Sequence, residues 1–425
     1  MIRALCDKVS AMDSQPATHD PQPEAAAEDF LSLDARNLRP SAIRAFAKLI
    51  NDPSVISFAG GLPSPETFPA IEFLECAEMI LRERAAVALQ YGPTPGLPRL
   101  RDSIAQICRS RGIDCTSDDV LITTGSQQAL QLVANVLLDP GDVVLVELPT
   151  YIGASASFYS RRAELVGVRQ DDQGIDTEDL RRVAARLRSE GRRIQCLYTI
   201  PNFQNPSGRL MTRARRSETL AIAAEFGFRI LEDDPYGELV YVEDADTTPM
   251  RSMDSHGRVI YLGSFSKVLA PGLRCGWIVA PPAMFRPLEL AKEAADLCSG
   301  MLDQSIVDEF VATGRLAPQI EKVRAFYREK RNIFMEALES EVGMLADWTP
   351  AAGGLFTFLT LRKPADTREW VSRAIEMGVA FVPGAPFFVD GSGLQTMRLT
   401  FAKETDARLR EGVGRLGELF RSADT

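Results

Sequence analysis

Histidine and lysine are both scarce in this 425-residue chain, and each shortage narrows the chemistry it can support. The two histidines are His19, in a Pro/Ala-rich stretch, and His256, in the turn "DSHGR". Neither position suits a buried general base, so a Ser-His-Asp triad or a histidine-based metal site is not expected. Only eight of the 48 basic residues are lysines, and none occurs between Lys48 and Lys267. A single lysine is therefore more informative here than a single arginine.

Other absences restrict the compartment and the partners. No apolar run approaches the roughly 18 residues of a membrane span, and the N-terminus has no long apolar segment of a secretory signal. The seven cysteines are scattered without a C-x-x-C pair, which predicts reduced thiols in a cytoplasmic protein. A net charge of −10 does not suggest a nucleic-acid surface. We therefore expect neither a membrane nor a nucleic-acid partner, and no metal site.

The order of patterns along the chain predicts an α/β fold. Residues 1–35 are low in aromatic and β-branched residues and predict a disordered extension. Apolar strands then alternate with helical patterns such as 126–138, 217–227 and 177–190, the last expected to be capped by Thr177. This alternation predicts a mostly parallel sheet with helices on both faces, followed beyond residue 283 by a smaller α+β region. The predicted strands of the first part are 119–125, 141–151, 193–202, 228–234, 258–264 and 275–281.

Ligands of such sheets bind beyond the carboxyl ends of the strands, so the residues at these positions are the candidates. They are polar or aromatic, as a charged aromatic ligand requires. In chain order they are Gly125, Ser126, Gln127, Tyr151, Asn205, Asp233, Tyr236, Ser264, Ser266, Lys267 and Arg274.

These candidates divide by chemistry. Gly125 and Ser126 begin a helix, whose free N–H groups attract anions, and Ser264, Ser266 and Arg274 add phosphate donors. Taken singly, a Gly-Ser pair is more often a turn and cap, and no nucleotide-binding glycine motif is present.

The other candidates suit an aromatic ring. Asp233 can pair with a protonated ring nitrogen, Tyr236 and Asn205 can bind a phenolic oxygen, and Tyr151 can stack on the ring. Lys267 follows a strand in a loop poor in other charges, where burial would make its amine nucleophilic. A reactive lysine, a carboxylate and a phosphate cup together indicate pyridoxal 5'-phosphate.

The chain at this point resembles the fold-type I, class I/II aminotransferases, and most closely the kynurenine/2-aminoadipate aminotransferase branch. The resemblance runs from about residue 36 onward and rests on motifs in the expected order. They include "YGPTPGLPRLR", "TTGSQQAL", "PNFQNPSG", "EDDPYGEL", "GSFSKVLAPGLRCGW", "FVPGAPFF" and "MRLTFA". It implies a large cofactor-binding domain, 76–320, with a mostly parallel seven-stranded sheet, and a small α+β domain, 321–425. Residues 36–75 would contribute to the small domain and the active site.

The same resemblance implies a role for each motif residue. Lys267 would form the Schiff base with the cofactor and then shuttle the proton, and Asp233 would pair with the pyridine nitrogen. Arg398 would bind the substrate α-carboxylate beside Asn205, and Gly61 and Arg44 would border the substrate side chain. Tyr91 would reach the phosphate of the partner subunit, because the family forms homodimers with shared active sites. The remaining cofactor contacts implied are Gly125, Ser126, Gln127, Tyr151, Tyr236, Ser264, Ser266 and Arg274.

The activity expected is transamination between an L-amino acid and a 2-oxo acid by a ping-pong mechanism. The alternative is a lyase, a β/γ-replacement or a carbon–carbon bond-forming enzyme that uses the same cofactor site. A transcription regulator would need a winged-helix module, which the roughly 35 residues before the resemblance are not expected to supply. The substrate side chain stays open: Arg44 in the site would favour dicarboxylic substrates, and Arg44 in solvent would favour apolar or aromatic ones.

Overall fold

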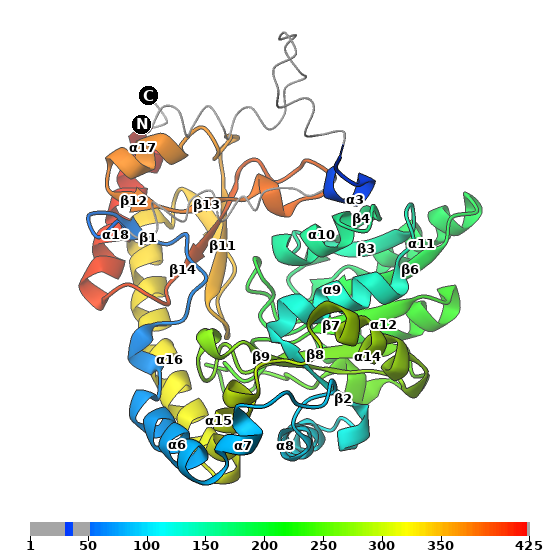
Figure 1. Ribbon diagram of the computed structural model, residues 1–425. Coiled ribbons are helices and arrows are strands. Elements are labelled where there is room, and N and C mark those ends of the chain that lie inside the picture. Colours follow the sequence, from blue (N-terminus) through cyan, green and yellow to red (C-terminus); the bar gives the residue numbers. More distant parts are fainter. Residues whose placement is uncertain (1–29, 37–51, 423–425) are drawn as a thin grey trace.

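The computed structural model describes residues 30–36 and 52–422, so Arg44 and nearly all of the predicted disordered extension lie outside the described residues. At the end of that extension, Leu33–Arg36 forms the short helix α3, where Asp34 pairs with Arg162 at 3.0 Å. The chain then builds a large helix-covered sheet and a smaller antiparallel sheet (Figure 1). The domain limits proposed at residues 75 and 320 both fall inside continuous helices, α6 (Ala70–Glu83) and α16 (Leu316–Val342).

The large sheet is mostly parallel, as predicted. It contains the six strands predicted from the apolar pattern, a seventh strand, β4, in agreement with the number that the resemblance implied, and a two-residue eighth strand, β5, at its edge. β9 runs antiparallel to its neighbours, and the five strands from β8 to β4 are parallel to one another. Across the sheet the order is β2 (Val120–Thr124), β9 (Cys275–Val279), β8 (Val259–Ser264), β7 (Arg229–Asp233), β6 (Ile194–Thr199), β3 (Val143–Leu148), β4 (Glu164–Asp171) and β5 (Gly174–Ile175).

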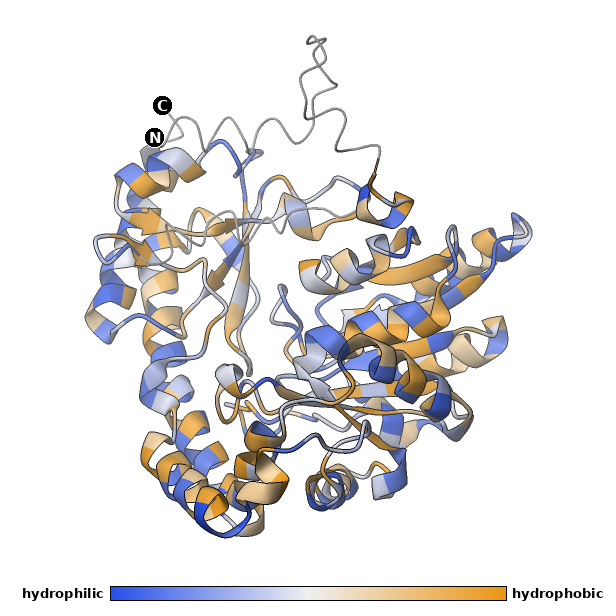
Figure 2. Ribbon diagram, viewed as in Figure 1, coloured by the Kyte–Doolittle hydropathy of each residue, from blue (hydrophilic) through white to orange (hydrophobic). Residues whose placement is uncertain are grey.

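Both faces of this sheet are buried, which explains why its strands are continuously apolar. In β3, Val143 and Leu145 belong to one buried cluster, and Val144 and Val146 belong to the other. The strands are accordingly hydrophobic and the outer faces of the helices polar in Figure 2. The first face is covered by α11 (Thr177–Ser189), α12 (Arg213–Phe226) and the short α13 (Met250–Met253), and the second by α9 (Gly125–Leu137), α10 (Ile152–Tyr159) and α14 (Pro282–Asp296).

A separate group of helices packs at the β2–β9 side of the large sheet. In this group α15 (Met301–Ala312) contacts α6 (Ala70–Glu83), α7 (Ala85–Ala88) and α8 (Pro98–Ser110). The 27-residue helix α16 (Leu316–Val342) runs from this group to the small sheet (Figure 1). No helix in the described ranges is both long and apolar enough to cross a bilayer.

The small sheet has the order β10 (Ala346–Trp348), β11 (Phe356–Leu361), β14 (Thr396–Thr400) and β13 (Val382–Pro383), all antiparallel. Helices α16 and α18 (Asp406–Ser422) pack on each other beside it, and α17 (Val371–Glu376) contacts α18. The N-terminal strand β1 (Ile56–Ser57) pairs in parallel with β12 (Val379–Ala380). This pairing attaches residues 56–57 to the part of the chain that contains the small sheet.

Two local details differ from the sequence analysis. Helix α11 is capped by Asp176, whose carboxylate accepts from the Glu178 and Asp179 N–H groups at 3.0 Å, and the expected cap, Thr177, is the first helical residue. Strand β4 was not among the strands predicted from the apolar pattern. Its residues are mostly half-buried, and it contains Gly167 and several polar side chains, so its apolar signal is weak.

Candidate active site

Lys267 lies in the loop between β8 and β9, beyond the carboxyl end of β8. Its Nζ donates a hydrogen bond to the carbonyl oxygen of Gly61 at 3.1 Å. Burial, with smaller contributions from the positive charges of Arg398 and Arg274, lowers the pKa of this amine to about 8. A larger fraction of Lys267 is therefore neutral and nucleophilic near pH 7 than for an ordinary lysine.

Asp233 is the last residue of β7 and is buried. Its Oδ2 accepts from the Tyr198 hydroxyl at 2.8 Å, while its Oδ1 is buried with no hydrogen-bond partner among the described residues. Burial raises the pKa of Asp233 to about 7, the Tyr198 hydrogen bond opposes this rise, and the Asp234 charge adds to it. A cationic N–H placed against Oδ1 would supply the missing partner and favour the carboxylate.

Two hydroxyls and a guanidinium converge near the start of α9. Ser264 Oγ donates to Ser266 Oγ at 2.9 Å, and Arg274 Nη2 donates to the Thr124 carbonyl at 3.3 Å. Gly125, with φ +74°, leaves no room for a side chain: a Cβ there would lie 2.5 Å from Arg274 Nη2. Together with the free N–H groups of the first helical turn, these donors (the phosphate cup) are the kind of groups that can bind a phosphate.

Ser126 and Gln127 lie in that first turn. The Gln127 side chain points away from the cup, because its Nε2 donates to Gly153 O at 3.1 Å and Ser157 Oγ at 2.9 Å on α10. Tyr151 precedes α10, and its ring lies across Gly153, where a Cβ would come within 2.5 Å of the Tyr151 hydroxyl. Glycine at 153 therefore makes room for the aromatic ring.

Asn205 joins the two domains at the site. Its Nδ2 lies 3.5 Å from the Tyr236 hydroxyl of the large domain, and its Oδ1 accepts from Arg398 Nη1 of β14 at 3.0 Å. Both Asn205 and Tyr236 are buried, and burial raises the pKa of Tyr236 above its ordinary value. Tyr236 therefore remains a hydrogen-bond donor at neutral pH.

Arg398 is a buried guanidinium without a carboxylate partner. It is 1% exposed, and none of the ion pairs within residues 30–36 and 52–422 includes it. Its Nη2 donates to Ala59 O at 2.9 Å, and its Nε has no hydrogen-bond partner in the part of the chain that the structure describes. Its guanidinium carbon lies 4.4 Å from the centre of the Phe356 ring and 5.3 Å from that of Phe387. Burial lowers the pKa of Arg398 to about 10, opposed by the nearby Tyr236 and Tyr151.

Gly61 lies between the amine and this guanidinium. Besides accepting from Lys267, it is the position where a Cβ would lie 3.0 Å from the Phe356 ring and 4.0 Å from Arg398 Nη2. Tyr91 is separate from these groups, with 79% of its surface exposed on the single chain. Arg44, the other predicted neighbour of the substrate, lies outside the described residues.

The family model "aminotransferase class I and II" matches residues 70–416 of this chain. The chain belongs to the class I and II aminotransferases. This membership confirms the predicted enzyme class and the predicted cofactor, pyridoxal phosphate, and the relatives favour transamination over the lyase alternatives.

Two curated aminotransferases and one solved structure illustrate the likeness. Aromatic-amino-acid aminotransferase 1 of Thermococcus litoralis is 41% identical and aligns over 93% of this chain and 94% of its own length. The 2-aminoadipate transaminase of Thermus thermophilus is 42% identical, over 91% and 95%. The crystal structure of Pyrococcus horikoshii kynurenine aminotransferase with PMP has a TM-score of 0.91 and 38% identity, over 95% of this chain and all of that one.

The geometry of this aminotransferase fits its cofactor at three independent points. The orphaned Asp233 Oδ1 is placed to meet a ring N–H, the Gly125–Arg274 cradle suits a phosphate, and Lys267 has a depressed pKa suited to an aldehyde. No group of three or more histidine, cysteine or acidic side chains in the described parts of the chain could hold a metal ion.

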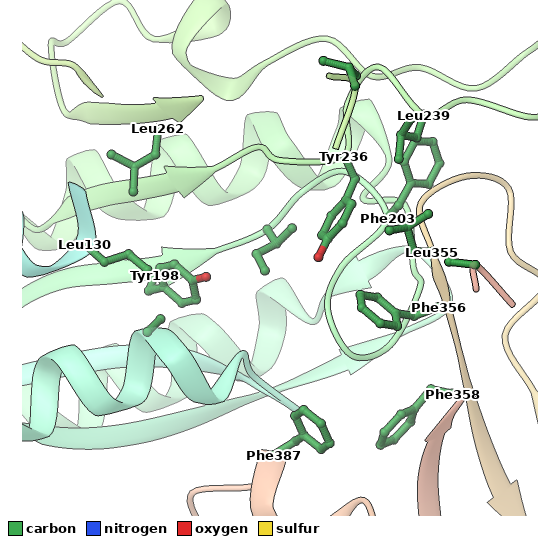
Figure 3. Packing of buried hydrophobic residues seen from close by; sticks show 14 of the residues in the cluster. Leu130, Tyr198, Phe203, Tyr236, Leu239, Leu262, Leu355, Phe356, Phe358 and Phe387 are labelled. Carbon is green, nitrogen blue, oxygen red and sulfur yellow. The ribbon is translucent and has the colours of Figure 1, made fainter. Parts of the chain in front are cut away.

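The sequence analysis missed several residues that shape the site. Tyr198, which holds Asp233, sits inside the apolar run of β6, where nothing marks its hydroxyl as functional. The Phe356 ring flanks Arg398 together with that of Phe387, but Phe356 begins a strand whose apolar pattern indicates only core. Figure 3 shows Tyr198, Tyr236, Phe356 and Phe387 within one buried cluster.

Proposed function

We propose that this enzyme transfers the amino group of L-amino acids with aromatic or comparably long side chains to a 2-oxo acid, by a ping-pong mechanism, as a cytoplasmic homodimer. The observation that carries the proposal is the meeting of Lys267 and Arg398 at Gly61. An amine and an unpaired guanidinium on two sides of one glycine can hold the α-amino and α-carboxylate ends of one substrate.

Each residue then has a defined task. Pyridoxal phosphate, when bound, supplies an aldehyde that takes up the amino group and a ring that accepts the electrons of the Cα–H bond. Lys267 binds that aldehyde and moves the proton away from Cα. The Asp233 carboxylate keeps the ring nitrogen protonated, and Tyr236 and Asn205 donate to the ring oxygen. Arg398 binds the α-carboxylate and so fixes the orientation of the Cα–H bond.

The aromatic substrate class is supported by the rings around Arg398 and by the relatives. Phe356 and Phe387 supply apolar surface directly beside the carboxylate site, where an aromatic side chain can pack edge to face. Relatives at about 40% identity are named for aromatic amino acids and for 2-aminoadipate.

The dimer is supported by apolar side chains left exposed on the single chain. They lie on and just after α6 and α7: Ile71, Leu74, Leu81, Val87, Leu89 and Tyr91. A surface of this kind marks an interaction site. We propose that a second copy covers it and thereby receives Tyr91 at its phosphate cup. The described cysteines are all free thiols, which supports a reducing compartment.

The test is conversion of the bound cofactor by a panel of amino acids, followed by absorbance. Aromatic amino acids should convert the aldehyde form to the amine form fastest, and a 2-oxo acid should reverse the change. Lys267→Ala should lose the band of lysine-bound cofactor and at least roughly 10²- to 10⁴-fold in turnover, while the exposed Lys322→Ala should match the parent. Release of a leaving group without conversion of the cofactor would refute transamination.

A further inference from the structure

Glu147 is a buried carboxylate outside the set of cofactor contacts. It lies at the carboxyl end of β3, where it is 1% exposed. Its Oε1 accepts from Thr199 Oγ1 at 2.8 Å, and its Oε2 accepts from the Ile200 N–H and from Gln204 Nε2, both at 3.2 Å. None of these partners carries a charge, and burial raises the pKa of Glu147 to about 7 despite them. Burying a carboxylate without a charged partner costs free energy, so the hydrogen bonds that Glu147 makes indicate which part of the structure it stabilises.

All three donors belong to the 199–209 segment, which also contains Asn205. Gln204 is the centre of that segment: its Nε2 also donates to Pro149 O at 2.7 Å, and its Oε1 accepts from the Ser207 N–H at 2.7 Å. Its backbone closes the loop through Gly208 N at 2.6 Å and Arg209 O at 2.8 Å. Glu147 therefore attaches this internally hydrogen-bonded loop to the carboxyl end of β3 in the large sheet.

The loop needs such an attachment because its backbone is strained and closely fitted. Phe203 has a left-handed φ of +52°, a conformation that a non-glycine residue keeps only when its surroundings enforce it. On the other side, a Cβ at Gly208 would lie 2.8 Å from Phe356 O of β11. In Figure 3 the Phe203 ring packs near Leu239 and Leu355, beside the Tyr236 and Phe356 rings. A released loop would move against the wall of the active site.

The residue directly after Gln204 is Asn205, whose Oδ1 accepts from Arg398 Nη1 at 3.0 Å. Glu147 is thus connected to the Arg398 guanidinium by two hydrogen bonds and one peptide link: Gln204 donates to Glu147, and the next residue, Asn205, accepts from Arg398. We propose that Glu147 is a positioning residue for the substrate-carboxylate site: it fixes the 199–209 segment so that Asn205 holds Arg398 in its binding orientation. This inference rests on the proposed role of Arg398.

The two variants Glu147→Ala and Glu147→Gln separate this role from a need for charge. Alanine removes every acceptor and frees the loop. Glutamine can still accept from Ile200 and Gln204 through its carbonyl, because the Thr199 hydroxyl can rotate and accept from the new amide. Alanine should therefore raise KM, and glutamine should keep KM within about threefold of the parent.

A matched control is available in Glu232, another fully buried carboxylate near the carboxyl end of a strand of the same sheet, β7, whose pKa burial also raises to about 7. It accepts from the Met250 and Arg251 N–H groups at 2.7 and 2.8 Å, and neither donor belongs to the 199–209 segment. Glu232→Ala should lower the thermal midpoint like Glu147→Ala and leave KM unchanged.

The measurement uses the cofactor-loaded enzyme and two readouts. One is KM and kcat for an aromatic amino acid. The other is the inhibition constant of 3-phenylpropionate, which has the carboxylate but no amino group. In Glu147→Ala, KM and this constant should rise together by roughly 10- to 100-fold, with kcat changed less than about threefold. Gln204→Leu, which breaks the same path from the other side, should reproduce the rise even if Glu147→Ala fails to fold.

The inference would be overturned if Glu147→Ala and Glu232→Ala had equal KM and equal inhibition constants for 3-phenylpropionate. An unchanged KM in Gln204→Leu would also overturn it. Arg398→Lys distinguishes it from the function on which it rests. If that variant leaves KM unchanged, the carboxylate assignment itself is wrong. If Arg398→Lys raises KM and the Glu147 and Gln204 variants do not, only the positioning role is wrong.

Discussion

The hydrogen bond from Tyr198 to Asp233 makes a quantitative prediction about the pH dependence of cofactor binding. Tyr198 is fully buried, so Tyr198→Phe deletes one hydroxyl with almost no change in packing. The bond it removes, 2.8 Å long, stabilises the ionised form of Asp233. Hydrogen bonds to charged groups contribute about 1.5–3 kcal/mol, which corresponds to about 1–2 pH units at 1.36 kcal/mol each.

In the cofactor-free enzyme, burial places the pKa of Asp233 at about 7. The variant should protonate Asp233 at correspondingly higher pH, so that roughly 5- to 50-fold fewer molecules carry the carboxylate at pH 7. Binding of a protonated ring nitrogen needs that carboxylate. The dissociation constant of pyridoxal phosphate should therefore rise by about this factor at pH 7, and parent and variant should converge as the pH is raised.

The assay is a titration of apoenzyme with pyridoxal phosphate, followed by absorbance, at pH values from 6 to 9.5. Tyr261→Phe is the matched control, because this buried tyrosine donates to Asp234 Oδ2 at 3.1 Å rather than to Asp233. Asp234 also keeps its contacts with Arg111 and Asn202. Superimposable profiles for the parent and Tyr198→Phe would refute the reasoning, as would an equal displacement in Tyr261→Phe.

Two further predictions concern stability and assembly. The pKa of Glu232, raised from 4.5 to about 7, means that the folded chain binds this proton more tightly than the unfolded chain. Its contribution to stability, at most about 3 kcal/mol, is present below pH 4.5 and lost as the pH rises through 7. Urea unfolding of the apoenzyme at pH 5 and pH 8 measures how much the free energy of unfolding falls between the two pH values. This fall should be smaller in Glu232→Gln than in the parent, and equal falls would contradict the prediction. In sedimentation, the parent should have twice the mass of one chain, and Leu74→Glu in the proposed dimer surface should approach one chain. A dimeric Leu74→Glu, or a monomeric Met344→Glu control at an exposed site far along the chain, would count against that surface.

The sequence was sufficient for the sheet and for the places of most candidate site residues along it, because both depend on local order. Apolar runs mark the buried strands, and the residue that follows each run must lie at one edge of a parallel sheet. Lys267, Asp233 and Ser264 were located in this way. Strand β4 was missed because a strand with mostly half-buried residues and Gly167 has no continuous apolar run.

What the sequence could not supply is the direction of individual side chains. Gln127 is at the predicted place on α9, yet its amide reaches α10. Tyr198 and Glu147 lie within apolar strands, where burial hides a polar function, and their partners are distant in sequence. The contact between Asn205 and Arg398 spans 193 residues and depends on how two domains meet.

The surroundings of Arg398 have a consequence for which molecules the enzyme can accept, if Arg398 binds the substrate as proposed. Its guanidinium lies beside two aromatic rings and pairs with no acidic side chain of residues 30–36 and 52–422, so an incoming anion would neutralise its charge. A substrate must therefore carry an anionic group in addition to a side chain that fits. Amino acids and the amines formed from them by decarboxylation have the same side chains. The buried Arg398 guanidinium would allow the enzyme to bind the amino acids and reject the amines.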